Sequence, residues 1–204
     1  MKILKIILIV LVAITAIFIS VYAYYGGFHS IEFRTKEQGG EILVYEDVVG
    51  DYSQTVEIAD QVFYSLLNDF NIETFRGFGI YYDNPAEVEA SILRSKVGRI
   101  LEDADSAKME LIGQKFKVKT LPKGTYTMTE FPYKGMMSIL VGLMKVYPEM
   151  HKQHAKGNIE IDGPIMEIYD VPNKKIIYRI LKGEEYFREN NIEEDIIEIE
   201  NDEE

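Results

Sequence analysis

The spacing of hydrophobic and polar positions first singles out the amino-terminal segment. Residues 6–25 are twenty consecutive uncharged, mostly apolar residues. At about 1.5 Å per residue, a helix of this length crosses a hydrocarbon layer of roughly 30 Å. We therefore expect a transmembrane anchor at residues 1–25. A signal peptide cleaved near residues 21–23 is the alternative, but its apolar core would exceed the usual length.

The pattern then becomes that of a mixed domain. Residues 26–40 are rich in Gly, Ser and charge with no sustained period, which predicts a linker. Strand-like runs follow at 41–48, 78–82 and 96–101, and apolar residues spaced by three and four predict a helix over 58–70.

The same order of elements then returns. Residues 116–119 lead through a turn at Pro122-Lys123-Gly124 into residues 125–131, where Thr and aromatic residues predict a strand. A second apolar stripe, at Met136, Met137, Leu140, Val141 and Met144, predicts a helix. Strands follow at 165–169 and 175–181. The expected fold is therefore α+β, a tandem strand-helix-strand-strand repeat with half-repeats at 41–102 and 116–182.

Short identities support this repeat. The residues that recur 87 positions later are Tyr82, Asp83 and Pro85, matched by Tyr169, Asp170 and Pro172. Repeated half-domains commonly face each other across a cleft, where ligands bind. We therefore expect the ligand-binding site of the domain to lie between the two halves.

Charge is concentrated at the carboxyl end. The formal net charge of the chain is −12. Residues 183–204 contain eleven Asp or Glu and one Arg, which predicts a solvated, disordered acidic tail and a possible protein partner for it. The remaining body is nearly neutral, so we expect no nucleic-acid binding.

The sequence also excludes several kinds of chemistry. There is no Cys, hence no thiolate site or disulfide. His151 and His154 have no convincing third ligand, so no metal is expected, and no nucleotide or cofactor fingerprint is present.

Four short motifs, taken in order, resemble one known family. They are Tyr81-Tyr82-Asp83-Asn84-Pro85, Val97-Gly98, Phe131-Pro132-Tyr133 and Met166-Glu167-Ile168-Tyr169. Over residues 41–182 the chain resembles the GyrI-like small-molecule-binding domain, and in layout its membrane-anchored branch. The resemblance implies a pseudo-two-fold domain with a groove for small, often aromatic or cationic ligands. The regulators of this family join the domain to a helix-turn-helix domain, whereas we expect residues 1–40 to be an anchor and a linker, and hence expect no DNA binding by this chain.

Glu167 is the leading candidate for a ligand contact. Strand alternation places it on one face with Ile165 and Tyr169. A carboxylate among apolar groups is costly unless paired, so it could hold a cationic ligand while aromatic rings stack on that ligand. The alternative is a strand-edge carboxylate, solvated or paired with Arg179 or Lys175.

Further candidates follow the same logic. Glu130 shares a strand face with Tyr126, but Glu46 is its counterpart in the first half, so Glu130 ranks below Glu167. Tyr82, Tyr126 and Tyr169 are the expected aromatic lining.

The favoured function is a membrane-anchored, non-catalytic domain that binds a small amphipathic or cationic molecule between its halves. The resemblance also implies an alternative, because some GyrI-like proteins resemble hydrolases of strained electrophiles: Glu167 would act as general base with Tyr82 or Tyr126 as the orienting donor. Another is an adaptor that acts through its acidic tail. Lys2 and Lys5 precede the span, which favours a cytoplasmic amino terminus and an exported domain.

Overall fold

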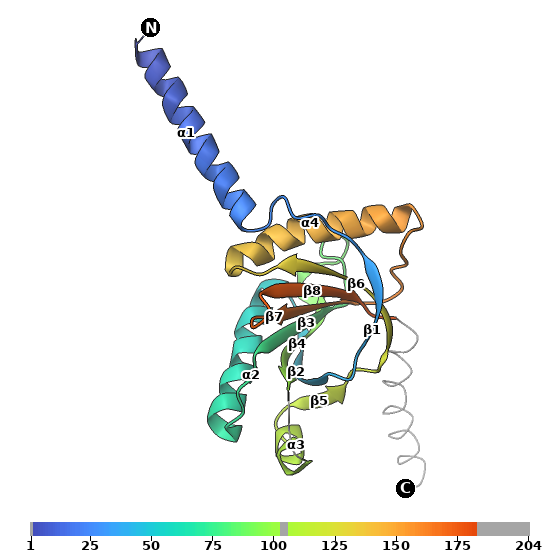
Figure 1. The fold of residues 1–204 in the computed structure, drawn as a ribbon. Coiled ribbons are helices and arrows are strands. Elements are labelled where there is room, and N and C mark those ends of the chain that lie inside the picture. Colours follow the sequence, from blue (N-terminus) through green and yellow to red (C-terminus); the bar gives the residue numbers. More distant parts are fainter. Residues whose placement is uncertain (1, 103–105, 183–204) are drawn as a thin grey trace.

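The computed structural model describes residues 2–102 and 106–182, and Figure 1 shows one long helix leaving a body built on a curled sheet. The long helix is α1 (Lys2–Tyr24). The strands are β1 (Arg34–Gln38), β2 (Ile42–Val49), β3 (Arg76–Tyr81), β4 (Arg94–Leu101), β5 (Lys117–Thr120), β6 (Gly124–Pro132), β7 (Ile165–Asp170) and β8 (Lys175–Ile180). The other α-helices are α2 (Thr55–Phe70), α3 (Ser106–Gly113) and α4 (Met136–Ala155). Single 3-10 turns lie at Tyr52–Gln54 and Ala90–Ile92.

The eight strands form one antiparallel sheet in the order β1-β6-β8-β7-β3-β4-β2-β5. The order is symmetric about the β7–β3 pair, which joins the two halves. β1 precedes β2 in the chain but pairs with β6, and β5 precedes β6 but pairs with β2. Each half therefore lends its first strand to the other half, which ties the α+β repeat into one unit.

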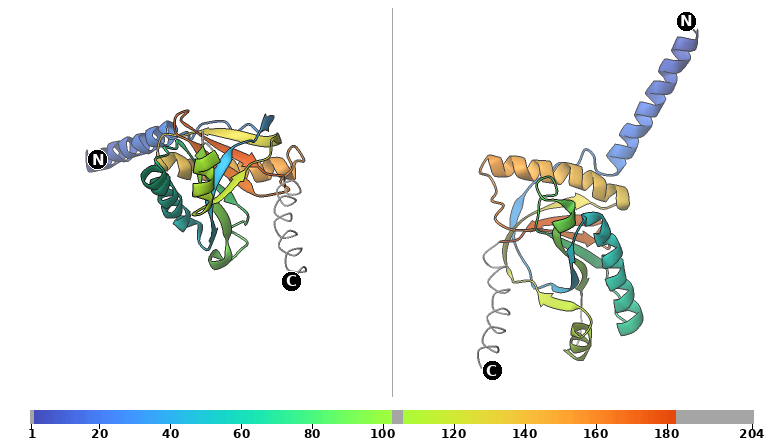
Figure 2. Two further views of the ribbon diagram at one scale, coloured as in Figure 1. Left: turned by 90° about the horizontal axis from the view of Figure 1, so that it is seen from below. Right: turned by 180° about the vertical axis from the view of Figure 1, so that it is seen from behind.

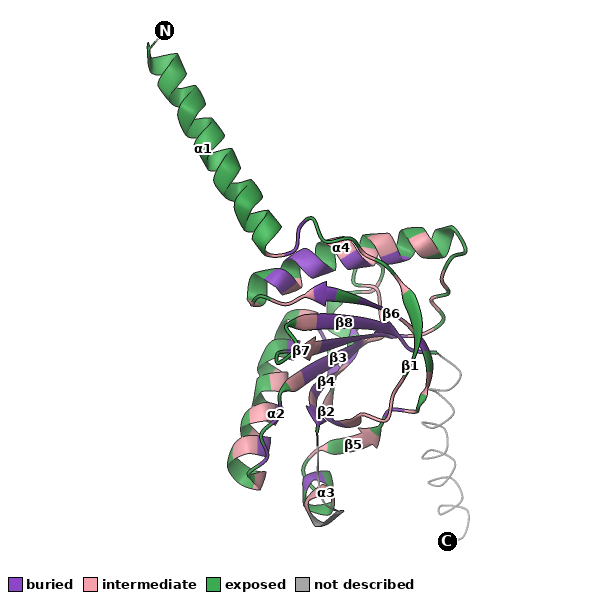
Figure 3. Cartoon of the chain, viewed as in Figure 1, coloured by how far each residue is buried: buried purple, intermediate pink, exposed green. Residues whose placement is uncertain are grey.

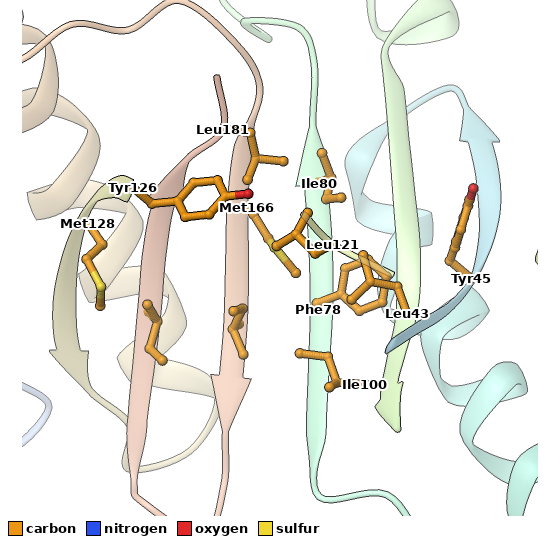
Figure 4. Packing of buried hydrophobic residues seen from close by; sticks show 12 residues of the cluster. Leu43, Tyr45, Phe78, Ile80, Ile100, Leu121, Tyr126, Met128, Met166 and Leu181 are labelled. Carbon is orange, nitrogen blue, oxygen red and sulfur yellow. The ribbon is translucent and has the colours of Figure 1, made fainter. Parts of the chain in front are cut away.

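Strand alternation sends side chains to two faces of this sheet. In β2, Leu43 and Tyr45 lie on one face and Val44 on the other. The first face carries the inner cluster, shown in Figure 4. Its members are Leu43, Tyr45, Phe78, Ile80, Ile100, Leu121, Tyr126, Met128, Met166, Ile168, Ile177 and Leu181. It unites residues of β2 and β6, which are far apart in strand order, because the sheet curls around it (Figures 1 and 2).

The opposite face is covered by helices. α2 buries Val62 and Leu66 against Val44 and Leu101. α4 buries Val146 and Met150 in a cluster with residues of β6, β7 and β8. The central strands thus have apolar neighbours on both faces. Most of their residues are buried, which Figure 3 shows in purple. Any polar side chain between α4 and the sheet is removed from water.

The amino-terminal segment differs from the expected linker. Residues 34–38 form β1, and Ile31 and Phe33 pack against the α4 cluster. Four of the five residues of β1 are exposed, because β1 is an edge strand. Its charged and polar sequence therefore has no apolar alternation from which a strand could be predicted. α1 is long and apolar enough to cross a membrane, and none of its described side chains is buried.

The stripe that predicted α4 is mostly not its packing face. Of the five stripe residues only Val141 is buried. The other four are exposed, namely Met136, Met137, Leu140 and Met144. The helix was identified correctly by its period, but its orientation was not.

A buried ion pair closes the inner side of the sheet. Arg179 of β8 is 0% exposed and donates to Glu41 at 2.8 Å and 3.2 Å, and to Gln38 Oε1 at 3.1 Å. Its guanidinium also lies over the Tyr126 ring, 5.2 Å from the centroid. These contacts hold the segment that connects β1 to β2 against β8.

Candidate functional site: a buried carboxylate among tyrosines

Glu167 lies near the centre of the sheet, on β7, and is 1% exposed. Its carboxylate accepts a hydrogen bond from the Tyr147 hydroxyl at 2.7 Å and another from the Tyr169 hydroxyl at 2.6 Å. Tyr147 comes from α4, whereas Tyr169 lies two residues further along the same strand face. The helix and the sheet therefore meet at this carboxylate.

Two more tyrosines complete the surroundings of Glu167. Tyr178, its register partner on β8, is fully buried, and its ring lies edge-on to Tyr147 with 6.0 Å between centroids. The Tyr178 hydroxyl has no hydrogen-bond partner among the described residues. Tyr81 stands at the end of β3, its ring 4.9 Å from that of Tyr52. The Tyr178 hydroxyl lies against α4, since a Cβ at Gly142 would be 2.5 Å from its oxygen, and an unsatisfied buried hydroxyl is a polar group available to a ligand.

These contacts set the protonation properties of the site. Burial raises the pKa of Glu167, and the hydrogen bonds from Tyr169 and Tyr147 offset only part of that rise. Burial also raises the pKa of Tyr147 and of Tyr169, and the neighbouring Glu167 charge adds to both rises. In the described part of the chain no Lys, Arg or His pairs with Glu167. Within residues 2–102 and 106–182 the site is therefore a carboxylate without a counter-ion, surrounded by neutral phenols.

The sheet also shows how the two halves correspond. Phe78 and Ile80 of β3 share the inner cluster with Met166 and Ile168 of β7, 88 positions later. The identities in the sequence recur after 87 positions, and a shift of one residue moves a strand side chain to the other face. The shared tyrosines therefore point in opposite directions: Tyr82 packs against the inner cluster and Tyr169 against the α4 cluster.

With an offset of 88, Tyr81 is the counterpart of Tyr169 and Gly79 the counterpart of Glu167. Gly79 and Glu167 are also register partners in the β3–β7 pair. The pseudo-two-fold axis thus passes between them. A Cβ at Gly79 would lie 2.6 Å from the Tyr81 hydroxyl oxygen, so glycine leaves the space that this ring occupies. One half supplies the charge and the other supplies room for the aromatic group.

The sequence-predicted site residues fall into two groups. Glu167 and Tyr169 meet on the helix-covered face. Tyr126 is buried on the inner face and donates its hydroxyl to the Pro122 carbonyl at 2.6 Å. Tyr82 borders the same inner cluster beside Arg94, whose guanidinium lies 5.8 Å from its ring centroid.

Glu130 is also not part of the Glu167 cluster. Its side chain is 44% exposed and accepts from Lys175 Nζ at 3.0 Å. It lines a separate surface pocket with His29 and Arg34 of the amino-terminal segment. The structure therefore gives Glu130 an ion-pairing partner, whereas Glu167 has none in the part of the chain that the structure describes.

Sequence reasoning missed Tyr147, Tyr178 and Tyr81. Alternation along β3 distinguishes Tyr81 from Tyr82, but the apparent 87-residue echo favoured the wrong neighbour. Tyr147 lies four positions after Leu143 and seven after Leu140, two residues that the structure leaves exposed, so helical spacing gives no signal that it contacts Glu167. Among the described residues no cluster of three or more His, Cys, Asp or Glu could hold a metal ion.

Comparison with solved structures agrees with this fold. The EcmrR C-terminal domain is 12% identical, with a TM-score of 0.51 over 74% of this chain and 96% of that one. EcmrR in a DNA complex is 11% identical, with a TM-score of 0.52 over 79% of this chain and 62% of that one. SAV2435 bound to tetraphenylphosphonium is 18% identical, with a TM-score of 0.50 over 76% of this chain and 96% of that one.

A search of curated proteins gives no match. A family model, however, matches residues 34–181, most of the chain, and its range begins at β1 and ends just after β8. The chain belongs to the family of the GyrI-like small molecule binding domain.

Proposed function

We propose that this protein is a membrane-anchored receptor domain that binds a lipophilic cation with Glu167 as its counter-ion. The observation that carries the proposal is the carboxylate itself, which is 1% exposed and hydrogen-bonded only by tyrosines in the described chain. A buried charge without a partner is costly. A cation that reaches Glu167 offsets this cost.

The tyrosines suit the same class of ligand. Aromatic faces attract cations within about 6 Å of the ring centroid, more strongly when water is excluded. Tyr81, Tyr147, Tyr169 and Tyr178 all approach the Glu167 position from different elements. Delocalised organic cations, which are weakly hydrated and apolar, match a site that offers one charge and several rings. The tetraphenylphosphonium bound to SAV2435 is such a cation and is the natural first probe.

Ligand binding requires the site to open, because both oxygens of the Glu167 carboxylate already accept a hydrogen bond from a tyrosine hydroxyl. Tyr147 is the movable member, since it belongs to α4 rather than to the sheet. Rotation of its ring exposes one carboxylate oxygen, while Tyr169 continues to donate to the other. The cationic ligand then replaces the neutral Tyr147 hydroxyl as the partner of that oxygen.

The proposal is tested with full-length protein in detergent and a panel that contains tetraphenylphosphonium, a quaternary ammonium and a neutral aromatic of similar size. We expect saturable binding of the cations. We expect Glu167→Gln to weaken cation binding at least about tenfold, about 1.4 kcal/mol, and to leave binding of the neutral compound unchanged. Glu130→Gln is the matched control, because that carboxylate is exposed and already paired. Equal binding by Glu167→Gln and wild type refutes the site.

We further propose that α1 is the anchor, with its amino terminus in the cytoplasm and the body exported. The length and apolar composition of α1 support the anchor, and Lys2 and Lys5 at its start support the orientation. Because the chain has no Cys, a single Tyr64→Cys substitution provides a unique thiol at an exposed position of α2. Labelling of intact cells by a membrane-impermeant maleimide is the expected result; labelling only after lysis reverses the orientation.

A further inference from the structure

An exposed apolar surface lies on α4. Its five residues are Met136 (65% exposed), Met137 (46%), Leu140 (51%), Leu143 (37%) and Met144 (69%). Their spacing of one, four, seven and eight residues places them on one side of the helix. We call this set the α4 outer face. The opposite side of α4 packs on the sheet through Val146 and Met150. A contiguous apolar face of this kind on a protein surface indicates something that covers it.

The end of α1 is fixed to α4 by polar contacts. Lys145 of α4 donates to the Gly27 carbonyl at 2.5 Å and to the His29 carbonyl at 2.7 Å. Gly26 is buried, and a Cβ there would lie 2.8 Å from the Phe131 ring. Lys134, two residues before α4, holds its ammonium 4.5 Å from the ring centroid of Tyr24. The chain therefore leaves α1 and is anchored on α4 within five residues.

The arrangement in space agrees with this connection. In Figures 1 and 2, α4 forms the side of the body from which α1 projects, and the sheet, α2 and α3 lie beyond it. The aromatic residues Tyr22, Tyr24 and Phe28 are exposed around the end of α1. Aromatic rings of this kind favour the boundary between hydrocarbon and headgroups. A bilayer crossed by α1 thus reaches its surface at the level of α4.

We infer that α4 is an interfacial helix whose outer face lies in the membrane surface and holds the domain against the lipid. This inference rests on the proposed membrane anchor. The occupant is lipid rather than a protein, because Lys145 and Lys134 hold the end of the apolar α1 on the helix that carries this face, so a bilayer crossed by α1 lies against the same side of the body. Amphipathic helices bury such a face about 5–10 Å into the headgroup boundary.

The placement also concerns the ligand site. α4 carries Tyr147, whose hydroxyl binds Glu167, three residues after Met144 of the outer face. The helix that lies on the lipid is therefore the one that covers the carboxylate. Lipophilic cations concentrate at a membrane surface, so the site stands beside their source.

The test uses tryptophan, because the chain contains none. Three single variants of the full chain are placed in vesicles. They are Leu140→Trp on the α4 outer face, Val12→Trp in the middle of α1, and Tyr64→Trp at an exposed position of α2. Their emission is compared in ordinary lipid and in lipid brominated either near the headgroup or near the chain end.

We expect Leu140→Trp to lose emission most with bromine near the headgroup, Val12→Trp most with bromine near the chain end, and Tyr64→Trp with neither. Quenching of Val12→Trp alone overturns the inference and leaves the anchor standing. Quenching of none of the three refutes both the anchor and the inference. A blue-shifted but unquenched Leu140→Trp shows that protein, such as a second copy of the chain, covers the face. Equal quenching of Tyr64→Trp shows general adsorption and also overturns the inference.

Discussion

The buried pair between Arg179 and Glu41 gives the sharpest prediction about stability. The Arg179 side chain is 1% exposed and that of Glu41 11%. Removal of one member of a buried pair leaves an uncompensated charge and costs about 3–5 kcal/mol. We expect Arg179→Met and Glu41→Gln each to lower the free energy of unfolding within or near this range. Arg179→Met also loses the packing on Tyr126.

The double variant distinguishes this mechanism from simple loss of packing. When both partners are neutral, no charge remains buried, so we expect the double variant to cost at least about 2 kcal/mol less than the sum of the single variants. The assay is equilibrium urea unfolding of the full chain in detergent, followed by near-ultraviolet circular dichroism, with the m-value checked for constancy. Lys115→Met is the control, because its pair with Asp69 is about half exposed and should contribute less than about 1 kcal/mol. Costs that add to within about 0.5 kcal/mol refute the reasoning.

Three further predictions concern the site and its charges. Gly79→Ala forces a Cβ against the Tyr81 hydroxyl, and we expect the free energy of unfolding in urea to fall by about 1–3 kcal/mol. Gly77→Ala is the control, because the nearest atom there is the flexible end of Arg99. A cost for Gly79→Ala no greater than that for Gly77→Ala contradicts the packing described. Tyr169→Phe removes one hydrogen bond to the Glu167 carboxylate, so the pKa of Glu167 should rise further, measured by carboxyl-carbon NMR titration; an unchanged or lower pKa is the contrary result. Although burial acts to raise the pKa of Glu41, the hydrogen bonds and charge of Arg179 lower it below the unfolded value. Stability from this group is present above the unfolded pKa of about 4.3 and is lost as the pH falls through the folded pKa, so the acid limb of the stability curve should be shallower in Glu41→Gln.

Much of the fold follows from the sequence alone. The α+β class and the order of β2, α2, β3, β4, β6, α4, β7 and β8 are readable because the residues of these elements show a strand or helix period. The exchange of β1 and β5 between the halves is not readable, because the partner of an edge strand is decided by tertiary contacts. β1, with the sequence Arg-Thr-Lys-Glu-Gln, has no apolar alternation that could reveal it.

The candidate site was predictable in its charge and not in its surroundings. Strand alternation correctly groups Glu167 with Tyr169. The 87-residue echo selects Tyr82, because identity of letters carries no information about the face to which a side chain points. The face is set by register, and the structural offset of 88 selects Tyr81 instead. Tyr147 approaches from a helix whose rotation depends on packing, and its exposed methionines resemble a core stripe.

The central claim is that Glu167 is the counter-ion of a bound cation, and its proton is the most direct reporter. Burial raises the pKa of Glu167, whereas a bound cation lowers it, so tetraphenylphosphonium should expel a proton from the carboxyl group when the pH lies between these two values. Titration calorimetry of the full chain in buffers of different ionisation enthalpy, from pH 4 to 8, measures this release together with affinity. We predict an affinity that falls as the pH drops through the Glu167 pKa, with a proton release that is absent in Glu167→Gln and retained in Glu130→Gln. The same proton release and pH profile in wild type and Glu167→Gln would contradict the account.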